Sequence, residues 1–121
     1  MNTNGRYAGF AERLVESVLA EPGHTPSELR RAALARAARL GGRGDPAGEG
    51  EARDGVPAAL AGYVDKVALH AYNVTDGDVA ALQRAGNSDD ALFEVTVAAA
   101  LGAALGRLER GLAALSGEEP A

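Results

Sequence analysis

The sequence predicts a small all-α protein, a bundle of about five helices that ends in a long helix rich in alanine and glycine. Three observations support this prediction. Apolar residues recur at spacings of three and four along most of the chain, which is typical of helices buried on one face. No segment shows the apolar–polar alternation of a half-buried strand. Glycine, proline, serine and threonine stand where one helical pattern stops and the next begins.

The first two helices are expected in the N-terminal third of the chain. Residues 6–19 carry an apolar stripe along one helical face. The second helix is expected to open at Thr25, because Glu28 follows three residues later in the pattern of a capping box. Gly41-Gly42 is expected to end it.

A glycine-rich segment over residues 41–55 is the clearest break in the helical pattern. It contains six glycines, one proline and no large apolar residue, so we expect a flexible loop. The length of the chain favours one domain over residues 1–121. Within it, the loop separates an expected helical pair over residues 1–40 from a main helical unit over residues 56–115.

Three further helices are expected after the loop. Pro57 suits the first position of the third helix. Thr75 is expected to cap a short fourth helix, which Gly86 stops. The fifth and longest is expected over residues 89–115, with two aspartates in its first turn, where the helix dipole favours negative charge.

The last helix combines two patterns that both suit close helix packing. Leucines recur at alternating spacings of four and three, as in a coiled-coil seam. Small residues also recur four apart, and interior glycines lower helix stability by about 1 kcal/mol each unless packing compensates. We expect this helix to join subunits of a homo-oligomer, although it could instead be a central helix within one subunit. The expected interface residues are Ala98, Leu101, Gly102, Leu105, Gly106 and Leu108.

Three side chains are candidates for catalysis. His70 is the residue best suited to exchange protons near neutral pH. Glu94 lies inside an apolar run, where a buried carboxylate would pair with a partner, and Tyr63 stands two turns before the histidine. The alternative is that His70 lies on the surface and that Glu94 faces solvent or pairs with Arg107 or Lys66.

Composition excludes several classes of function. The net charge of −5 gives no basic footprint for nucleic acid. With no cysteine, the chain has neither disulfides nor a thiolate nucleophile. Neither His24 nor His70 has a second ligand at metal-binding spacing, so we expect no metal or cofactor. The longest apolar stretch, residues 95–106, is shorter than the ~20 residues that span a bilayer, and no signal peptide is apparent. We therefore expect no membrane contact and a cytoplasmic location.

Residues 63–115 resemble the carboxymuconolactone decarboxylase and AhpD-like alkylhydroperoxidase superfamily. The resemblance lies in the capped VTDGDVAAL segment, the NSDDALFEV turn into the long helix, and the small-residue run ending at Arg107. It implies an all-helical fold that assembles into dimers, trimers or hexamers. The redox members of that superfamily act through a CxxC pair, which this chain lacks, so it is not a thiol peroxidase of that kind.

Three functional hypotheses follow. The first is a self-associating binding or accessory protein. The second is an enzyme of carboxymuconolactone decarboxylase type with His70 as base, acting on a small acidic molecule that Arg107, Arg84 or Lys66 would bind through its charge. The third is a structural partner of a cysteine-bearing relative.

Overall fold

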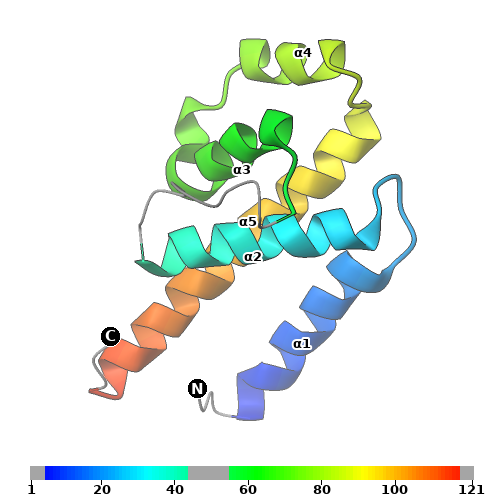
Figure 1. The fold of residues 1–121 in the computed structure, drawn as a ribbon. Coiled ribbons are helices and arrows are strands. Elements are labelled where there is room, and N and C mark those ends of the chain that lie inside the picture. Colours follow the sequence, from blue (N-terminus) through cyan, green and yellow to red (C-terminus); the bar gives the residue numbers. More distant parts are fainter. Residues whose placement is uncertain (1–4, 44–54, 118–121) are drawn as a thin grey trace.

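The computed structural model describes residues 5–43 and 55–117, and every regular element within them is helical (Figure 1). This confirms the all-α prediction, including the long last helix. The elements are α1 (Gly5–Ala20), α2 (Ser27–Arg43), α3 (Ala58–His70), the short 3₁₀ helix η2 (Ala71–Asn73), α4 (Asp76–Arg84) and α5 (Asp89–Leu115).

The central packing in the fold is between α2 and α5, which cross each other (Figure 1). Glycines at the crossing let the two backbones meet. A Cβ atom built on Gly102 would stand less than 3.0 Å from the carbonyl oxygen of Leu34. The same holds for Gly106 against the carbonyl oxygen of Ala38. Any side chain at these two positions would therefore push α2 away from α5.

The predicted end of the second helix at Gly41-Gly42 is wrong, because α2 continues to Arg43. The reason is tertiary packing. A Cβ atom on Gly41 would stand less than 3.0 Å from the backbone of Ala103 in α5. Gly41 is therefore a contact residue inside the helix. Residues 44–54 of that loop lie outside the described residues.

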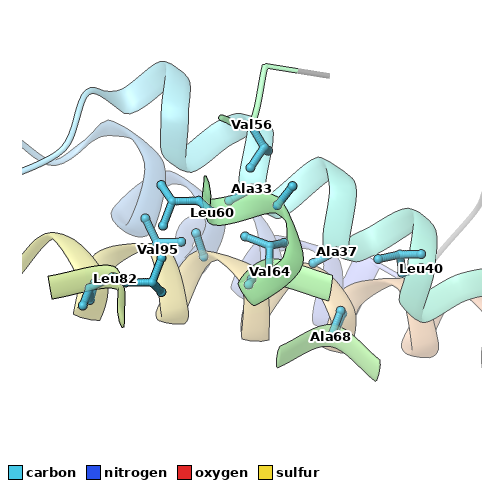
Figure 2. Packing of buried hydrophobic residues seen from close by; sticks show 14 residues of the cluster. Ala33, Ala37, Leu40, Val56, Leu60, Val64, Ala68, Leu82 and Val95 are labelled. Carbon is cyan, nitrogen blue, oxygen red and sulfur yellow. The ribbon is translucent and has the colours of Figure 1, made fainter. Parts of the chain in front are cut away.

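One apolar core joins α2, α3 and α5 (Figure 2). Ala33 and Ala37 from α2, Val64 from α3 and Val95 from α5 are almost completely buried in it. The predicted grouping of residues 1–40 apart from the later helices therefore does not describe the packing, because α2 contributes to the same core as α3 and α5.

The helix ends around α4 follow the predicted turn chemistry. The Thr75 hydroxyl accepts a hydrogen bond from the backbone N–H of Asp78, and the Asp78 carboxylate accepts one from the N–H of Thr75, which completes a capping box. Gly86 follows α4 with φ of +108°, a backbone conformation that favours glycine. Ser88 then caps α5 by accepting from the N–H of Ala91.

A buried ion pair joins α2 to α3. Arg36 is completely buried, and its Nε and Nη2 atoms donate to the two carboxylate oxygens of Asp65 at 2.6 and 2.8 Å. The sequence carries a signal for it, since Arg36 stands three residues after Ala33 on the apolar face of α2. A charged residue at a buried helical position implies a partner of opposite charge.

The first helix is attached mainly by its C-terminal end. Leu19 is buried, and Arg30 of α2 donates from Nη1 to the carbonyl oxygen of Val18 at 2.8 Å. Farther from this end, Phe10 and Leu14 are exposed. The apolar stripe predicted for this helix is therefore exposed at Phe10 and Leu14, half-buried at Val15 and Val18, and buried at Leu19.

Candidate interface on the last helix

His70 lies on the surface at the end of α3. Its Nδ1 atom is 3.4 Å from the Tyr72 hydroxyl, and the two rings meet edge to face. Tyr72 is itself 83% exposed. Among the residues that the structure describes, the histidine therefore has a solvent-exposed tyrosine as its hydrogen-bond neighbour and no carboxylate bonded to it.

Glu94 serves a different part of the molecule, the turn between α1 and α2. Its carboxylate accepts from the N–H of His24 at 2.7 Å and from both the N–H and the hydroxyl of Thr25 at 2.8 and 2.6 Å. The capping box predicted at Thr25 with Glu28 is therefore wrong, because Glu94 takes both Thr25 donors from another helix. Burial opposes ionisation of Glu94, but these hydrogen bonds and the nearby Arg30 charge outweigh it and hold its pKa below the ordinary value.

His70 and Glu94 are not brought together. The backbone of α3 near His70 is level with Arg107 of α5, because Arg107 donates to the carbonyl oxygen of Ala68. Glu94 lies thirteen residues before Arg107 on the same helix, which corresponds to about 20 Å along its axis. The predicted catalytic pair is therefore not assembled in this structure.

Tyr63 is held by a structural hydrogen-bond chain. Its hydroxyl is 2.6 Å from the hydroxyl of Thr96, which in turn donates to the carbonyl oxygen of Leu92 at 2.6 Å. Since the Thr96 proton is used in that second bond, Tyr63 is the donor in the first. The tyrosine thus ties α3 to α5, although one side of it also lines a small hollow of about 250 Å³ beside Lys66.

The cations considered for binding an acidic molecule are dispersed. Lys66 pairs with Asp78 at 2.9 Å, and this hydrogen bond, with that from the N–H of Thr75, holds the pKa of Asp78 below its ordinary value. Arg107 is bonded to the backbone of α3. Arg84 is exposed at the end of α4. Within residues 5–43 and 55–117, no group of three or more potential metal ligands is gathered in one place.

The small residues expected to form a subunit interface are buried within the chain instead. Ala98, Gly102 and Gly106 are buried, and the two glycines meet the backbone of α2. This part of the prediction is wrong for a physical reason. A glycine spacing shows that another backbone comes close, but the pattern is the same whether that backbone belongs to this chain or to another copy.

The leucine seam has a different environment. None of its five members is among the buried residues of α5. Leu108 and Leu115 are 49% and 85% exposed, while Leu101, Leu105 and Leu112 are half-buried. Leu108 and Leu115 are therefore largely accessible, while the other three leucines are partly covered within the described residues.

The side of α5 opposite α2 is apolar along most of its length, and we call it the outer face. Asp90, in the first turn, lies at the same helical angle as Leu108 and gives this side an acidic start. From Phe93 to Leu115, at 3.6 residues per turn, seven residues follow on this side, and all are exposed except Val97, which is half-buried. None of them is charged or polar. They are Phe93, Val97, Ala100, Ala104, Leu108, Gly111 and Leu115.

The exposure of both phenylalanines is unusual for a folded domain. The chain contains two, Phe10 and Phe93, and both are more than 60% exposed. Phenylalanine is ordinarily among the most buried residue types. Large exposed apolar surfaces on a folded domain mark contact sites for another protein, a ligand or a membrane.

By length and composition alone, α5 could also cross a bilayer. Its best 18-residue window has a mean hydropathy of 1.5, and 39% of that window is buried against the rest of the chain. The core helix of a soluble protein has the same properties. Hydropathy therefore does not distinguish a bilayer from another protein chain as the surface that covers the outer face.

No protein-family model, curated protein or solved structure matches this chain. The support for a function lies in the geometry of the outer face.

Proposed function

We propose that this protein is a self-associating helical subunit without catalytic activity, and that the outer face of α5 is its interface with a second copy. The assembly would serve as a binding or accessory component. The observation that carries this proposal is the outer face itself, an uncharged and exposed surface that extends over about 33 Å of one helix. A helix that is apolar on both its inner and outer sides is typical of one buried on both sides.

The energetics are compatible with such an interface. Burying a valine, leucine or phenylalanine side chain contributes ~1.5–3 kcal/mol. Four residues of this size, present in two copies, set an upper bound of about 12–24 kcal/mol, and the gain is smaller because Val97 and Leu108 are already partly buried in the single chain. Association itself costs about 4–15 kcal/mol. The four residues are Phe93, Val97, Leu108 and Leu115.

A second copy suits this face better than a membrane does. If α5 spanned a bilayer, α2 would enter with it, because α2 contacts α5 at Gly102 and Gly106 in the middle of the helix. The ion pair of Arg36 with Asp65 would follow, and charged groups are strongly disfavoured in the hydrocarbon core. Contact with an anionic surface is disfavoured by the net charge of −5.

Sedimentation velocity at about 1–100 µM would test the proposal, since stable interfaces have dissociation constants in or below this range. We expect the wild type to sediment as a dimer or larger species. The double variant Phe93→Gln/Leu108→Gln should sediment as a monomer with unchanged helical circular dichroism. Glu109→Gln is the matched control, because it introduces the same residue on the same helix away from the outer face.

Two results would overturn the proposal. One is a wild type that remains monomeric over the whole concentration range. The other is flotation of the wild type with vesicles of phosphatidylcholine and phosphatidylglycerol that the double variant abolishes, since the outer face would then belong to a membrane.

The superfamily resemblance of residues 63–115 and the cytoplasmic location stay predictions. The resemblance is in keeping with a homo-oligomeric helical protein, and the cysteine-free sequence leaves no thiol chemistry. The alternative of an enzyme based on His70 gains no support from the geometry described above.

A further inference from the structure

We propose that two copies pair through antiparallel α5 helices, with Ala104 of each copy on the two-fold axis. This inference rests on the proposed function and specifies how the outer face would be paired. It starts from the spacing of the seven outer-face residues, which runs 4, 3, 4, 4, 3, 4 along the chain. That spacing is the same in both directions from Ala104, as a surface that pairs with itself through a two-fold axis requires.

The pairs that this register creates are complementary in size. Ala104 meets its own copy at the centre. On either side, Ala100 lies opposite Leu108, and then Val97 lies opposite Gly111. Each of these outer pairs joins a large residue to a small one, which is how facing helices interdigitate.

Side-chain size also follows the shape of two crossing helices. Such helices are closest at their crossing point and separate toward their ends. Ala104, which would lie at the crossing point, is small. Phe93 and Leu115, which would face each other at the ends, are the largest pair on the face and the most exposed, at 69% and 85%. The wider gaps would therefore be filled by the larger side chains.

Charge favours the antiparallel orientation over the parallel one. Asp89 and Asp90 occupy the first turn of α5, and Asp90 lies on the outer face, at the same helical angle as Leu108. A parallel pair would place these carboxylates beside their counterparts and align the two helix dipoles unfavourably. An antiparallel pair separates the two acidic turns by most of the helix length.

The repeat length of the face predicts the geometry of the pair. Phe93, Ala104 and Leu115 are eleven residues apart, as are Val97 and Leu108. An eleven-residue repeat corresponds to 3.67 residues per turn, slightly above the 3.6 of a straight helix. Such a repeat favours a slight right-handed supercoil of the two helices. The heptad of the leucine seam would instead impose a left-handed supercoil.

Cysteine cross-linking would test this register directly, because the chain has no native cysteine. A disulfide requires Cα atoms within about 7 Å, so Ala104→Cys should form on the order of tenfold more covalent dimer on oxidation than Ala114→Cys. Ala114 is the matched control, since it is an exposed alanine on α5 outside the outer face. Val97→Cys and Gly111→Cys should cross-link when mixed and only weakly when each is oxidised alone.

The outcomes separate this inference from the proposed function. Strong cross-linking of Val97→Cys to itself and of Gly111→Cys to itself would indicate parallel pairing and overturn the inference. A dimer in sedimentation that forms no Ala104→Cys cross-link would also overturn it, while leaving self-association intact. A monomer in sedimentation would instead reject the proposed function, and the register with it.

Discussion

The two sides of α5 are both apolar, yet their residues differ in size. The inner side, which faces α2 and α3, contains Gly102 and Gly106 at the points where backbones touch. The outer face contains Phe93, Leu108 and Leu115, which contact nothing that would bury them within the described chain. Hydropathy does not distinguish the two sides.

At the crossing with α2, the smallest side chains mark the buried side of α5, which hydropathy does not distinguish from the outer face. A helix that packs tightly inside a chain of small residues needs its smallest residues at the contact. Larger apolar residues on the opposite side fill space only when a partner supplies a surface. The following predictions test this contrast, from the largest expected effect to the smallest.

The largest effect is expected for Gly102→Leu. A Cβ atom alone would stand less than 3.0 Å from the Leu34 carbonyl oxygen, so the crossing of α2 over α5 must open. We expect a loss of about 3 kcal/mol or more in the free energy of unfolding, measured by urea titration with circular dichroism. Gly111→Leu, where a Cβ meets no atom within 4 Å, is the control on the outer face. Equal losses in the free energy of unfolding of Gly102→Leu and Gly111→Leu would contradict the contrast between a closely packed inner side and an open outer face.

An intermediate effect is expected for Glu94→Gln, at the polar edge between the two sides. The variant removes a carboxylate that accepts three hydrogen bonds from His24 and Thr25, and we expect the free energy of unfolding to fall by about 1–2 kcal/mol at neutral pH. Asp90→Asn, which alters an exposed contact with His24 and one exposed charge in the first turn of α5, should change it by less than about 0.5 kcal/mol.

The contribution of Glu94 should also depend on pH. Because folding lowers its pKa, the stabilisation is fully present above the ordinary value of 4.5 and is lost as pH falls through the lower folded-state pKa. The difference between wild type and Glu94→Gln in urea midpoints should therefore shrink from pH 6 toward pH 3. A difference that stays constant over this interval would contradict the assignment of the carboxylate as the cause.

The smallest effect is expected for Gly111→Ala, and its sign is opposite. Alanine restricts the unfolded chain more than glycine does, and the added methyl group meets no atom within 4 Å. We expect the variant to be more stable by about 0.5–1 kcal/mol when it is measured at a dilution that keeps the chain monomeric. A loss of stability would mean that this end of the outer face is covered within one copy.

The sequence was sufficient for the number and type of helices. It also predicted local features such as the Thr75 cap and the stop at Gly86, because these depend on nearby residues alone. It failed at Gly41, where contact with Ala103 decides the backbone conformation. It failed at Thr25 for a similar reason, since the acceptor of its hydrogen bonds lies 69 residues later in the chain.

The candidate site was predictable in part. The sequence predicted that α5 packs on more than one side, but the same glycines suited an internal and an external partner equally well. The pairing of His70 with Glu94 failed because sequence neighbours give no information about which end of a bundle a side chain faces. The burial of Arg36 could be inferred from its position on the apolar face of α2. The periodicity of the apolar residues alone does not show it, because arginine is not an apolar residue.

The crossing of α2 with α5 has a consequence for how the chain folds during its synthesis. The two helices meet through residues such as Leu34 and Gly102, which leave the ribosome far apart in time. Until residues 98–106 have emerged, only α3 can cover part of the apolar side of α2 at Ala33 and Ala37, and contacts as distant in sequence as those with α5 form slowly. The packing of α5 onto α2 completes the core and at the same time forms the outer face. A nascent chain would therefore be able to bind a second copy only after its own core has formed.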